Sequence, residues 1–486
     1  MNASVIDVAR LEAATPAPAP MNARTLMLLT APILPTLLSL AWPNVLVMLA
    51  QASTGLIETW WVSRLGTDAL TGMALVFPGF MMMAMLSAGA IGGGVSSAVA
   101  RALGAGRRAD ANALVAHALM INLALGLLTS ALFLAFGRPL YAAMGGRGAS
   151  LEAAMQYSNV VFAGNILVWL MNGLASVIRG TGDMLFPSMV ICLGVAFLIP
   201  LSPLFIFGLG PIPALGIAGG GVAVVATTAL MAAILAWRIL SGGSIVRFRI
   251  ARLRPAFFAD ILRVGAVGSL STLQTTLTVA LTTGLVGAAA GPQAVAGYGT
   301  GSRLEYLLIP LVFGVGAPLV AMVGANIGAG QNRRALRIAM TGGALAFAAT
   351  EAIGLAAAIW PAAWLNLFGD DPTMVATGKA YLSFVGPMYG FFGLGLALYF
   401  ASQGAGKLLW PLFAGFARLV IAVGGGWLAL TSTGSLTLVF AALGAALAAY
   451  GAIVGVAIWS GVWFRKGAAR GEVGGPSPLR PQLSRS

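Results

Sequence analysis

Three acidic side chains lie deep within long apolar stretches of the chain. Of its thirteen Asp and Glu residues, only Glu58, Glu305 and Glu351 are placed in this way. An acid at the centre of a bilayer costs about 2.5–3.5 kcal/mol on insertion scales, so it needs a partner, water or a proton. A carboxyl group that takes up and releases a proton inside a membrane is typical of proton relays. These residues are therefore the first candidates for chemistry.

Arg303 stands two residues before Glu305, so on a regular helix the two side chains point to different faces. Helical rise puts them roughly 14–18 Å below the outer end of their stretch, and Glu58 roughly 9 Å below the outer end of its own. If the two stretches face each other, this predicts a coupling of Glu58 with Arg303 or Glu305 that a proton switches. Two structural alternatives remain: a Glu58 that pairs with Arg64 at the interface, and an ion pair that only stabilises the second half of the chain.

Three further polar side chains stand within apolar stretches: Asn44, Asn172 and Arg418. The two asparagines can hydrogen-bond within a helical bundle or contact a substrate, and bundle packing is the simpler interpretation. For Glu351 we expect a structural role. The sequence assigns no role to Arg418.

Membrane-spanning helices must position these residues. The chain is 59% hydrophobic and 8% charged, whereas a soluble domain carries about 25% charged residues. Stretches long enough to cross a bilayer recur along it. Twelve are predicted, at roughly 32–62, 68–103, 110–137, 153–180, 184–210, 213–240, 257–290, 293–328, 334–361, 374–403, 408–432 and 435–464. One cysteine, Cys192, and one histidine, His117, exclude a disulfide framework and a His- or Cys-rich metal site, and we expect no cofactor.

The distribution of Lys and Arg predicts the orientation. With the N-terminus in the cytoplasm, 21 of the 27 fall in cytoplasmic segments, 4 in outer loops and 2 within spans, as the positive-inside rule requires. Topology and contact with anionic lipid then explain the net charge of +14, and nucleic acid need not be invoked. We predict a multi-pass protein of the plasma (inner) membrane with both termini cytoplasmic. The expected parts are a disordered tail (1–30), a six-helix lobe (31–240), a basic linker (241–256), a second six-helix lobe (257–465) and a disordered tail (466–486).

A glycine pattern recurs at an offset of 224 residues. IRGTGDMLFP at 178–187 and SQGAGKLLWP at 402–411 match at four of ten positions, and the Gly-Ala-Gly of 104–106 recurs at 328–330. Glycine suits tight turns between helices because it adopts positive φ at no steric cost. Two copies of a six-span unit start on the same membrane face, so their pseudo-two-fold axis runs along the membrane normal. The predicted fold class is an all-α polytopic membrane protein with twelve transmembrane helices in two six-helix lobes.

Two similar lobes in a membrane favour a transporter whose central cleft opens alternately to either side. A channel is an alternative that single-channel currents would reveal. An intramembrane enzyme is disfavoured, because the sequence contains no DDxxD or HExxH motif. A nucleotide-binding loop at the glycines is excluded because no strand precedes them.

Several segments together resemble the multidrug and toxic compound extrusion (MATE) family. They are the first span with PN…Q…IETWWVSRLG, the run GGGVSSAVARALGAGRRADA at 92–111, the turn IRGTGDMLFP, and the segment YGTGSRLEYLLIPLVFGVGAPLVAMVGANIGAGQNRRA at 298–335. The resemblance covers about residues 30–465. It implies a transporter of two six-helix lobes that exports organic, usually cationic or amphipathic, compounds in exchange for H⁺ or Na⁺. We accordingly expect a monomer that lies among membrane lipids and moves drug-like small molecules.

The resemblance also implies roles for single residues. Glu58 occupies the position of an acid that the family's first span carries, and Gln51 that of a preceding glutamine. Gln274 stands near a glutamate of the Na⁺-linked NorM-type branch, and span 10 lacks that branch's aspartate. The chain therefore resembles the DinF-type branch more closely, and we expect coupling to H⁺ rather than Na⁺. The expected proton-coupling or substrate-binding residues are Glu58, Glu305, Arg303, Gln51, Gln274 and Asn172.

A lipid-linked oligosaccharide flippase of the same broad superfamily is the nearest alternative function. The cleft of such a protein has to accept phosphate and therefore needs several Arg or Lys residues within its spans. Only Arg303 and Arg418 meet that requirement here, which argues against a flippase.

Overall fold

The computed structural model describes residues 21–249 and 252–464, and the regular elements in this part of the chain are helices. The first half contains α2 (Ala23–Thr30), α3 (Ile33–Ser63), α4 (Thr67–Met85), η1 (Leu86–Ile91), α5 (Gly92–Gly104), α6 (Arg108–Ala143), α7 (Gly148–Ala163), α8 (Asn165–Gly180), α9 (Leu185–Phe207) and α10 (Ile217–Leu240). The second half contains α11 (Pro255–Gly328), α12 (Asn332–Ile359), α13 (Pro361–Leu365), α14 (Pro372–Val385), η2 (Gly386–Met388), α15 (Tyr389–Ala405), α16 (Leu409–Leu419), η3 (Val420–Gly425), α17 (Gly426–Thr433), α18 (Leu436–Trp459) and η4 (Val462–Phe464).

Among the described residues, eleven helical segments are long and apolar enough to cross a membrane, and the bent pair α7–α8 makes a twelfth span. The helix α11 supplies two of them, Pro255–Gly291 and Gln293–Gly328, because the backbone turns at Gly291, where φ is +77°. The two parts of the bent pair meet at 45°. The twelve spans predicted from the sequence are confirmed.

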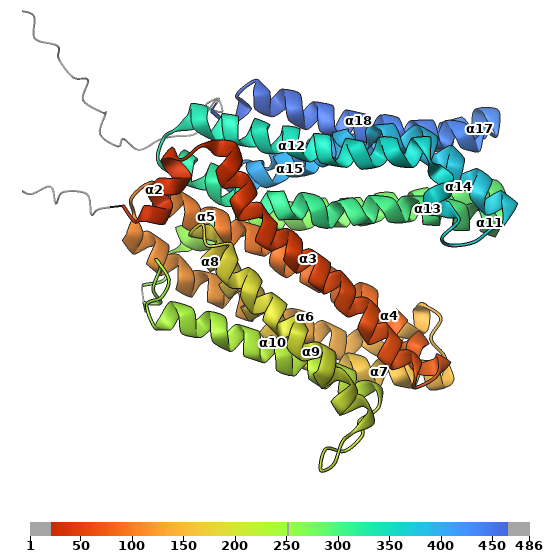
Figure 1. Cartoon of the computed structure of the whole chain (residues 1–486), viewed down its shortest axis with the longest axis horizontal. Coiled ribbons are helices and arrows are strands. Elements are labelled where there is room, and N and C mark those ends of the chain that lie inside the picture. Colours follow the sequence, from red (N-terminus) through yellow and green to blue (C-terminus); the bar gives the residue numbers. More distant parts are fainter. Residues whose placement is uncertain (1–20, 250–251, 465–486) are drawn as a thin grey trace, which may run out of the picture.

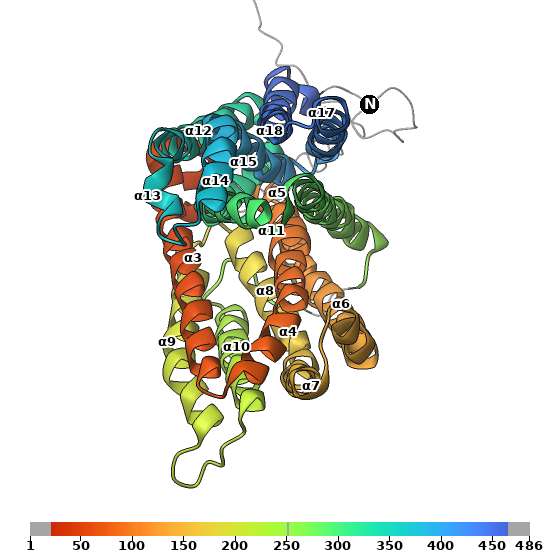
Figure 2. The ribbon, with the colours of Figure 1, turned by 90° about the vertical axis from the view of Figure 1, so that its right-hand side faces the viewer.

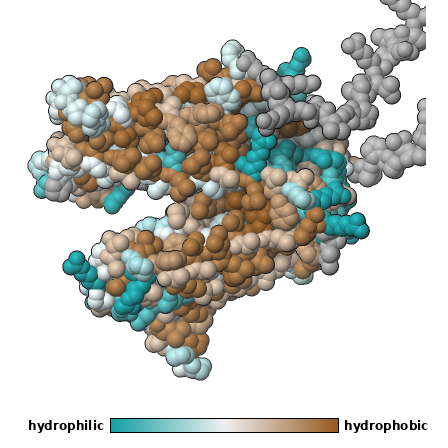
Figure 3. Space-filling view, turned by 180° about the vertical axis from the view of Figure 1, so that it is seen from behind, coloured by the Kyte–Doolittle hydropathy of each residue, from teal (hydrophilic) through white to brown (hydrophobic). Residues whose placement is uncertain are grey.

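The helices form two lobes that touch at one end and separate at the other (Figure 1, Figure 2). The first lobe comprises α3 to α10 and the second α11 to α18, and each has a hydrophobic core of its own. In the space-filling view the lobes are two arms with an open cleft between them (Figure 3). Hydrophilic surface gathers where the arms join. We call this joined end the base.

Glycine geometry confirms the duplication. Gly106 and Gly330, 224 residues apart, have φ values of +72° and +73°. Gly182 and Gly406, at the same offset, have φ values of +85° and +70°. A residue with a Cβ would be strained at such angles. The recurrent glycines of the sequence thus mark the same turn in both lobes.

The pseudo-two-fold axis passes through the base, between α5 and the end of α11. A Cβ built on Gly104 would lie 2.0 Å from the Ala325 carbonyl oxygen, and one built on Gly328 would lie 2.1 Å from the Arg101 carbonyl oxygen. Both pairs of equivalent positions are 224 residues apart, so the two contacts are copies of each other. The absence of side chains at these glycines lets the two helices meet backbone to backbone.

The predicted disordered tail at 1–30 is wrong for Ala23–Thr30, which form α2. The Asn22 side chain caps this helix by accepting a hydrogen bond from the Arg24 N–H at 2.9 Å. Leu28 is buried, and its carbonyl accepts a hydrogen bond from Asn326 of the second lobe at 3.0 Å. A helix of eight residues depends on such docking rather than on its own propensity, so the sequence alone did not indicate it.

The remaining tail predictions fall at 1–20 and 466–486, which lie outside the described residues. The predicted basic linker at 241–256 overlaps the start of α11, which begins at Pro255.

Candidate functional site

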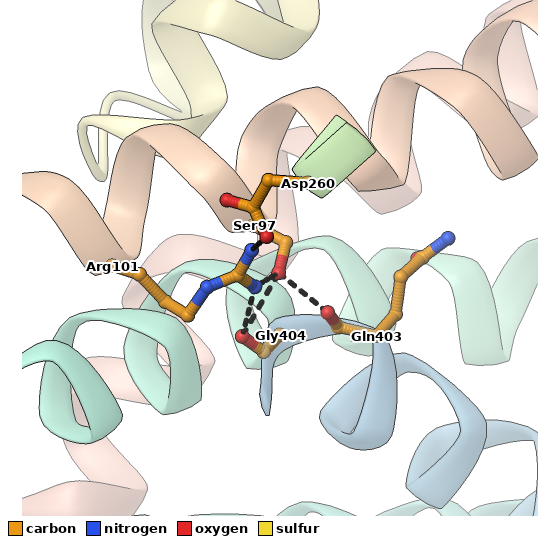
Figure 4. Close-up of polar contacts among 5 residues, drawn as sticks. All are labelled: Ser97, Arg101, Asp260, Gln403 and Gly404. Carbon is orange, nitrogen blue, oxygen red and sulfur yellow. Dashed lines mark hydrogen bonds and ion pairs between the residues drawn. The ribbon is translucent and has the colours of Figure 1, made fainter. Parts of the chain in front are cut away.

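A polar network closes the base by joining α5 to the second lobe (Figure 4). The Ser97 hydroxyl lies 2.5 Å from the Gln403 carbonyl oxygen and 2.9 Å from that of Gly404, at the end of α15. Arg101 forms an ion pair of 2.7 Å with Asp260 of α11 and donates to the Gly404 carbonyl at 3.2 Å. The Gln403 side chain donates back to the Gly89 carbonyl at 2.9 Å. Hydrogen bonds donated from both lobes therefore join them at the base.

Glu58 lies on α3, near the end of that helix remote from the base. Its Oε1 is buried and has no hydrogen-bond partner, and no ion pair of the described residues includes it. The carboxyl group lies close to Tyr157 of α7, within the first lobe. Arg64 does not pair with it; the Arg64 guanidinium lies 4.7 Å from the centroid of the Trp60 ring. A carboxyl group in this setting needs a proton or water.

Glu305 lies in a second polar cluster, inside the other lobe. Its Oε1 is 2.9 Å from Nη2 of Arg418 on α16, and its Oε2 accepts a hydrogen bond from the Tyr381 hydroxyl at 3.2 Å. The two charged side chains are only 18% and 12% exposed. The Arg418 guanidinium also lies 5.4 Å from the centroid of the Phe392 ring. A buried charge pair with additional contacts of this kind is strongly coupled, because removing one partner leaves the other without compensation.

A cavity of about 370 Å³ adjoins this cluster, among the two spans of α11, the helices α15, α16 and α18, and Met85 and Gly89 of the first lobe. Among its described lining residues Arg418 alone is charged. Gln274 is buried on its wall, where the Nε2 atom has no hydrogen-bond partner. Aromatic rings supply much of the remaining wall: Phe313, Phe392, Tyr399, Phe400 and Tyr450. The cavity thus combines stacking surfaces with an unpaired amide donor and one cation.

The other residues expected in the site lie elsewhere. Arg303 is exposed, with its guanidinium 5.6 Å from the centroid of the Phe368 ring, and Gln51 is exposed on α3. Asn172 is buried and donates to the Ser87 hydroxyl at 2.8 Å, which ties α8 to η1. Glu351 accepts a hydrogen bond of 2.7 Å from the Gly390 N–H at the start of α15, a structural contact.

The structure thus brings together only part of the expected site. Gln274 lines the same cavity as Arg418, the partner of Glu305, whereas the Glu305 carboxylate binds Arg418 and Tyr381 and not Glu58. No hydrogen bond or ion pair of the described residues joins Glu58 to Arg303 either. In this structure Glu58 is therefore joined to neither residue, because depth along a helix says nothing about which lobe a side chain faces, and the proton-switched coupling stays a prediction.

Two features of the site were missed by sequence reasoning. Arg418 was noticed as an intramembrane cation, but its partner is 113 residues away, and only the fold brings them together. The base network was missed because it uses backbone carbonyls of Gln403 and Gly404. The signal available for it was Ser97 and Arg101 in the glycine-rich run at 92–111.

Comparison with known proteins yields consistent matches. The family model MatE matches residues 43–204 and 269–428. The chain is 28% identical over 379 residues to a FAD transporter of Shewanella oneidensis, covering 77% of this chain and 82% of that protein. It is 25% identical over 399 residues to the probable multidrug resistance protein NorM of Thermotoga maritima, covering 79% and 84%.

Solved structures match the fold over almost their whole length. A MOP superfamily transporter from Pyrococcus furiosus superposes with a TM-score of 0.83 at 24% identity, covering 91% of this chain and 98% of that one. An outward-facing multidrug resistance MATE family transporter gives a TM-score of 0.80 at 24% identity, with the same coverage. These matches do not separate the DinF-type branch from the NorM-type branch, so that assignment stays a prediction.

Proposed function

Because the chain belongs to the MATE family of multidrug efflux transporters, and is a transporter rather than an enzyme, we propose that it exports organic, amphipathic or cationic small molecules in exchange for H⁺. The observation that carries the proposal is the Glu58 carboxyl group in the first lobe, one oxygen of which, Oε1, is buried without a hydrogen-bond partner. Proton uptake removes the charge of such a group, and proton release restores it, so the two states favour different surroundings.

We further propose that the base faces the cytoplasm of a cell whose plasma (inner) membrane the chain spans as a monomer, with both termini cytoplasmic. The support is the charge distribution, because most Lys and Arg residues belong to segments at that end. The cleft in Figure 3 then opens outward. Rocking of the two lobes about the base would close the arms and open the cytoplasmic side.

Two sequence features support H⁺ as the coupling ion. Gln274 stands where the resemblance implies a glutamate in the Na⁺-linked branch, and the span containing α15 carries no acid. Glu305 is already paired with Arg418. Glu58 is then the carboxyl group best suited to alternate between a bound and a released proton.

A second candidate cargo is a flavin dinucleotide. The relative from Shewanella oneidensis is named a FAD transporter. The cavity beside Arg418 has aromatic walls on which a planar flavin ring would stack, and Arg418, which is paired with Glu305, is the one charged residue of its described lining. The two candidates differ in charge and are therefore separable by experiment.

The test uses the full chain reconstituted into lipid vesicles, with an imposed pH gradient and either a fluorescent organic cation or FAD as cargo. We expect gradient-driven exchange of one of them to be lost in Glu58→Gln, which keeps the shape of the side chain but cannot release a proton. Asp68→Asn, which removes a carboxylate from an exposed position in the first turn of α4, serves as the matched control. Exchange in Glu58→Gln at the wild-type rate would refute the role of Glu58. Exchange that follows a sodium gradient instead would refute coupling to H⁺.

A further inference from the structure

A second, larger pocket opens at the base, outside the cleft. It has a volume of about 620 Å³ and lies among α2, the start of α6, the end of α10 and the segment 242–245. Three arginines line it: Arg24, Arg108 and Arg238. No acidic residue belongs to its described lining. The Asp183 carboxylate pairs with Arg24 at 2.7 Å and so offsets one of the three positive charges. The pocket therefore keeps a net positive charge.

Two of the arginines have donors to spare. The Arg238 guanidinium lies 4.7 Å from the centroid of the Phe186 ring, and its Nε is buried without a hydrogen-bond partner. Arg108 is exposed, and within the part of the chain that the structure describes its guanidinium donates to the Ile245 carbonyl, at 3.0 Å from Nη2. The Ser244 hydroxyl, also on the pocket wall, is buried and has no partner either. Convergent N–H and O–H donors with net positive charge are the chemistry that recognises a phosphate group.

The surroundings indicate that the phosphate belongs to a lipid. Trp237 and Leu240, on the last turn of α10 beside Arg238, are 63% and 68% exposed. Leu26 of α2 is 49% exposed. Tryptophan is enriched at the boundary between hydrocarbon and headgroups, and basic pockets between spans at that level bind anionic headgroups. These side chains offer an apolar surface for acyl chains next to a cationic pocket.

We propose that this pocket binds the phosphate of an anionic phospholipid, with Arg108 and Arg238 as its main ligands. The bound lipid would act on the base through α2, which contacts both lobes: Arg24 pairs with Asp183 of the first, and Asn326 of the second holds the Leu28 carbonyl. A headgroup beside Arg24 would therefore strengthen the closed base. This site is distinct from the cleft and from the cavity beside Arg418.

The test is a binding measurement on the purified full chain in detergent, with three probes: phosphatidylglycerol, phosphatidylcholine and inorganic phosphate. We expect phosphatidylglycerol to bind and to raise the melting temperature, and phosphatidylcholine to do neither. Loss of one charged hydrogen-bond donor should weaken the binding of phosphatidylglycerol by about tenfold or more in Arg238→Gln. Arg108→Gln changes an exposed position and should also weaken the binding of phosphatidylglycerol, so it tests the site even if Arg238→Gln proves hard to purify.

The matched control is Arg333→Gln, which removes the same charge from an exposed position at the start of α12 in the other lobe. Its affinity for phosphatidylglycerol should equal that of the unmodified chain. The proposal would be overturned if the Arg108→Gln/Arg238→Gln double variant bound phosphatidylglycerol as tightly as the unmodified chain does. Equal affinity for the two lipids would also overturn it. Binding of inorganic phosphate without binding of phosphatidylglycerol would overturn the assignment to a lipid and indicate a soluble phosphate compound.

Discussion

The backbone contact between α5 and α11 predicts what one methyl group at the base would do. In Gly104→Ala the new Cβ would lie 2.0 Å from the Ala325 carbonyl oxygen, whereas real Cβ contacts essentially never fall under 3.0 Å. The neighbouring atoms belong to a helix backbone, so no side chain can rotate away. The two helices must therefore part by about 1 Å, in an interior packed as densely as a crystal.

The penalty applies only to the conformation in which the base is closed, because the contact joins the two lobes. Overpacking of this kind costs about 1–3 kcal/mol. Since 1.4 kcal/mol corresponds to a factor of ten, the ratio of closed to open base should fall by about fivefold to 150-fold. If the lobes rock as rigid bodies, the arms must approach each other as the base opens.

Distance measurements between spin labels at the arm tips test this expectation. Ala149, beside the start of α7, and Asn366, after α13, are both exposed and lie on different arms. Cys192 is the only cysteine of the chain, so Cys192→Ser gives a clean background for the labels. In Gly104→Ala we expect a shorter distance population to grow relative to the unmodified chain.

The control is Gly284→Ala, because a Cβ there would meet no heavy atom within 4 Å. It should leave the distances unchanged. If folded Gly104→Ala protein gave the same distance distribution as the control, closure of the base would not govern the arms, and the reasoning would be refuted.

Three further substitutions test the polar contacts. Arg418→Gln leaves the Glu305 carboxylate without its cation, so the free energy of unfolding should fall by about 3–5 kcal/mol. In thermal melts, adding Glu305→Gln to this variant should restore part of the lost stability. Glu351→Gln keeps an oxygen that can accept from the Gly390 N–H, so stability should change by less than about 0.5 kcal/mol and vesicle transport should persist. Asp260→Asn removes the carboxylate that pairs with Arg101, but Asp260 is 47% exposed. The closed base should therefore lose less than about 1 kcal/mol relative to the open one, and the distances between the spin labels should change less than in Gly104→Ala.

The sequence predicted the scaffold well because its determinants are local or periodic. A span is recognised by about 20 successive apolar residues, whatever lies beside it in space. Gly182 and Gly406 were recognised as equivalent turns by their neighbours, and their positive φ values bear this out. The α7–α8 bend did not disturb the prediction, because the apolar stretch continues through it.

The site was predicted less well because its contacts are set by which lobe a residue faces. Glu305 and Glu58 lie at compatible depths along their helices, yet they belong to separate clusters in different lobes. Helix α2 escaped prediction for a related reason. Its stability comes from Asp183 and Asn326, which are remote in the chain, and not from its own eight residues.

The duplication extends to the glycines but not to the charges. With the one inserted residue that aligns Gly66 with Gly291, the position equivalent to Glu58 in the second lobe is Thr283. At the offset of 224, the position equivalent to Arg418 in the first lobe is Gly194. Two lobes that pivot about a common axis need matching turns and a matching contact at the base, which explains why Gly104 and Gly328 recur. Matching charges are unnecessary if one lobe handles the proton and the other the cargo. The division of Glu58 and Arg418 between the lobes therefore favours coupling through the shared base rather than direct competition at one site.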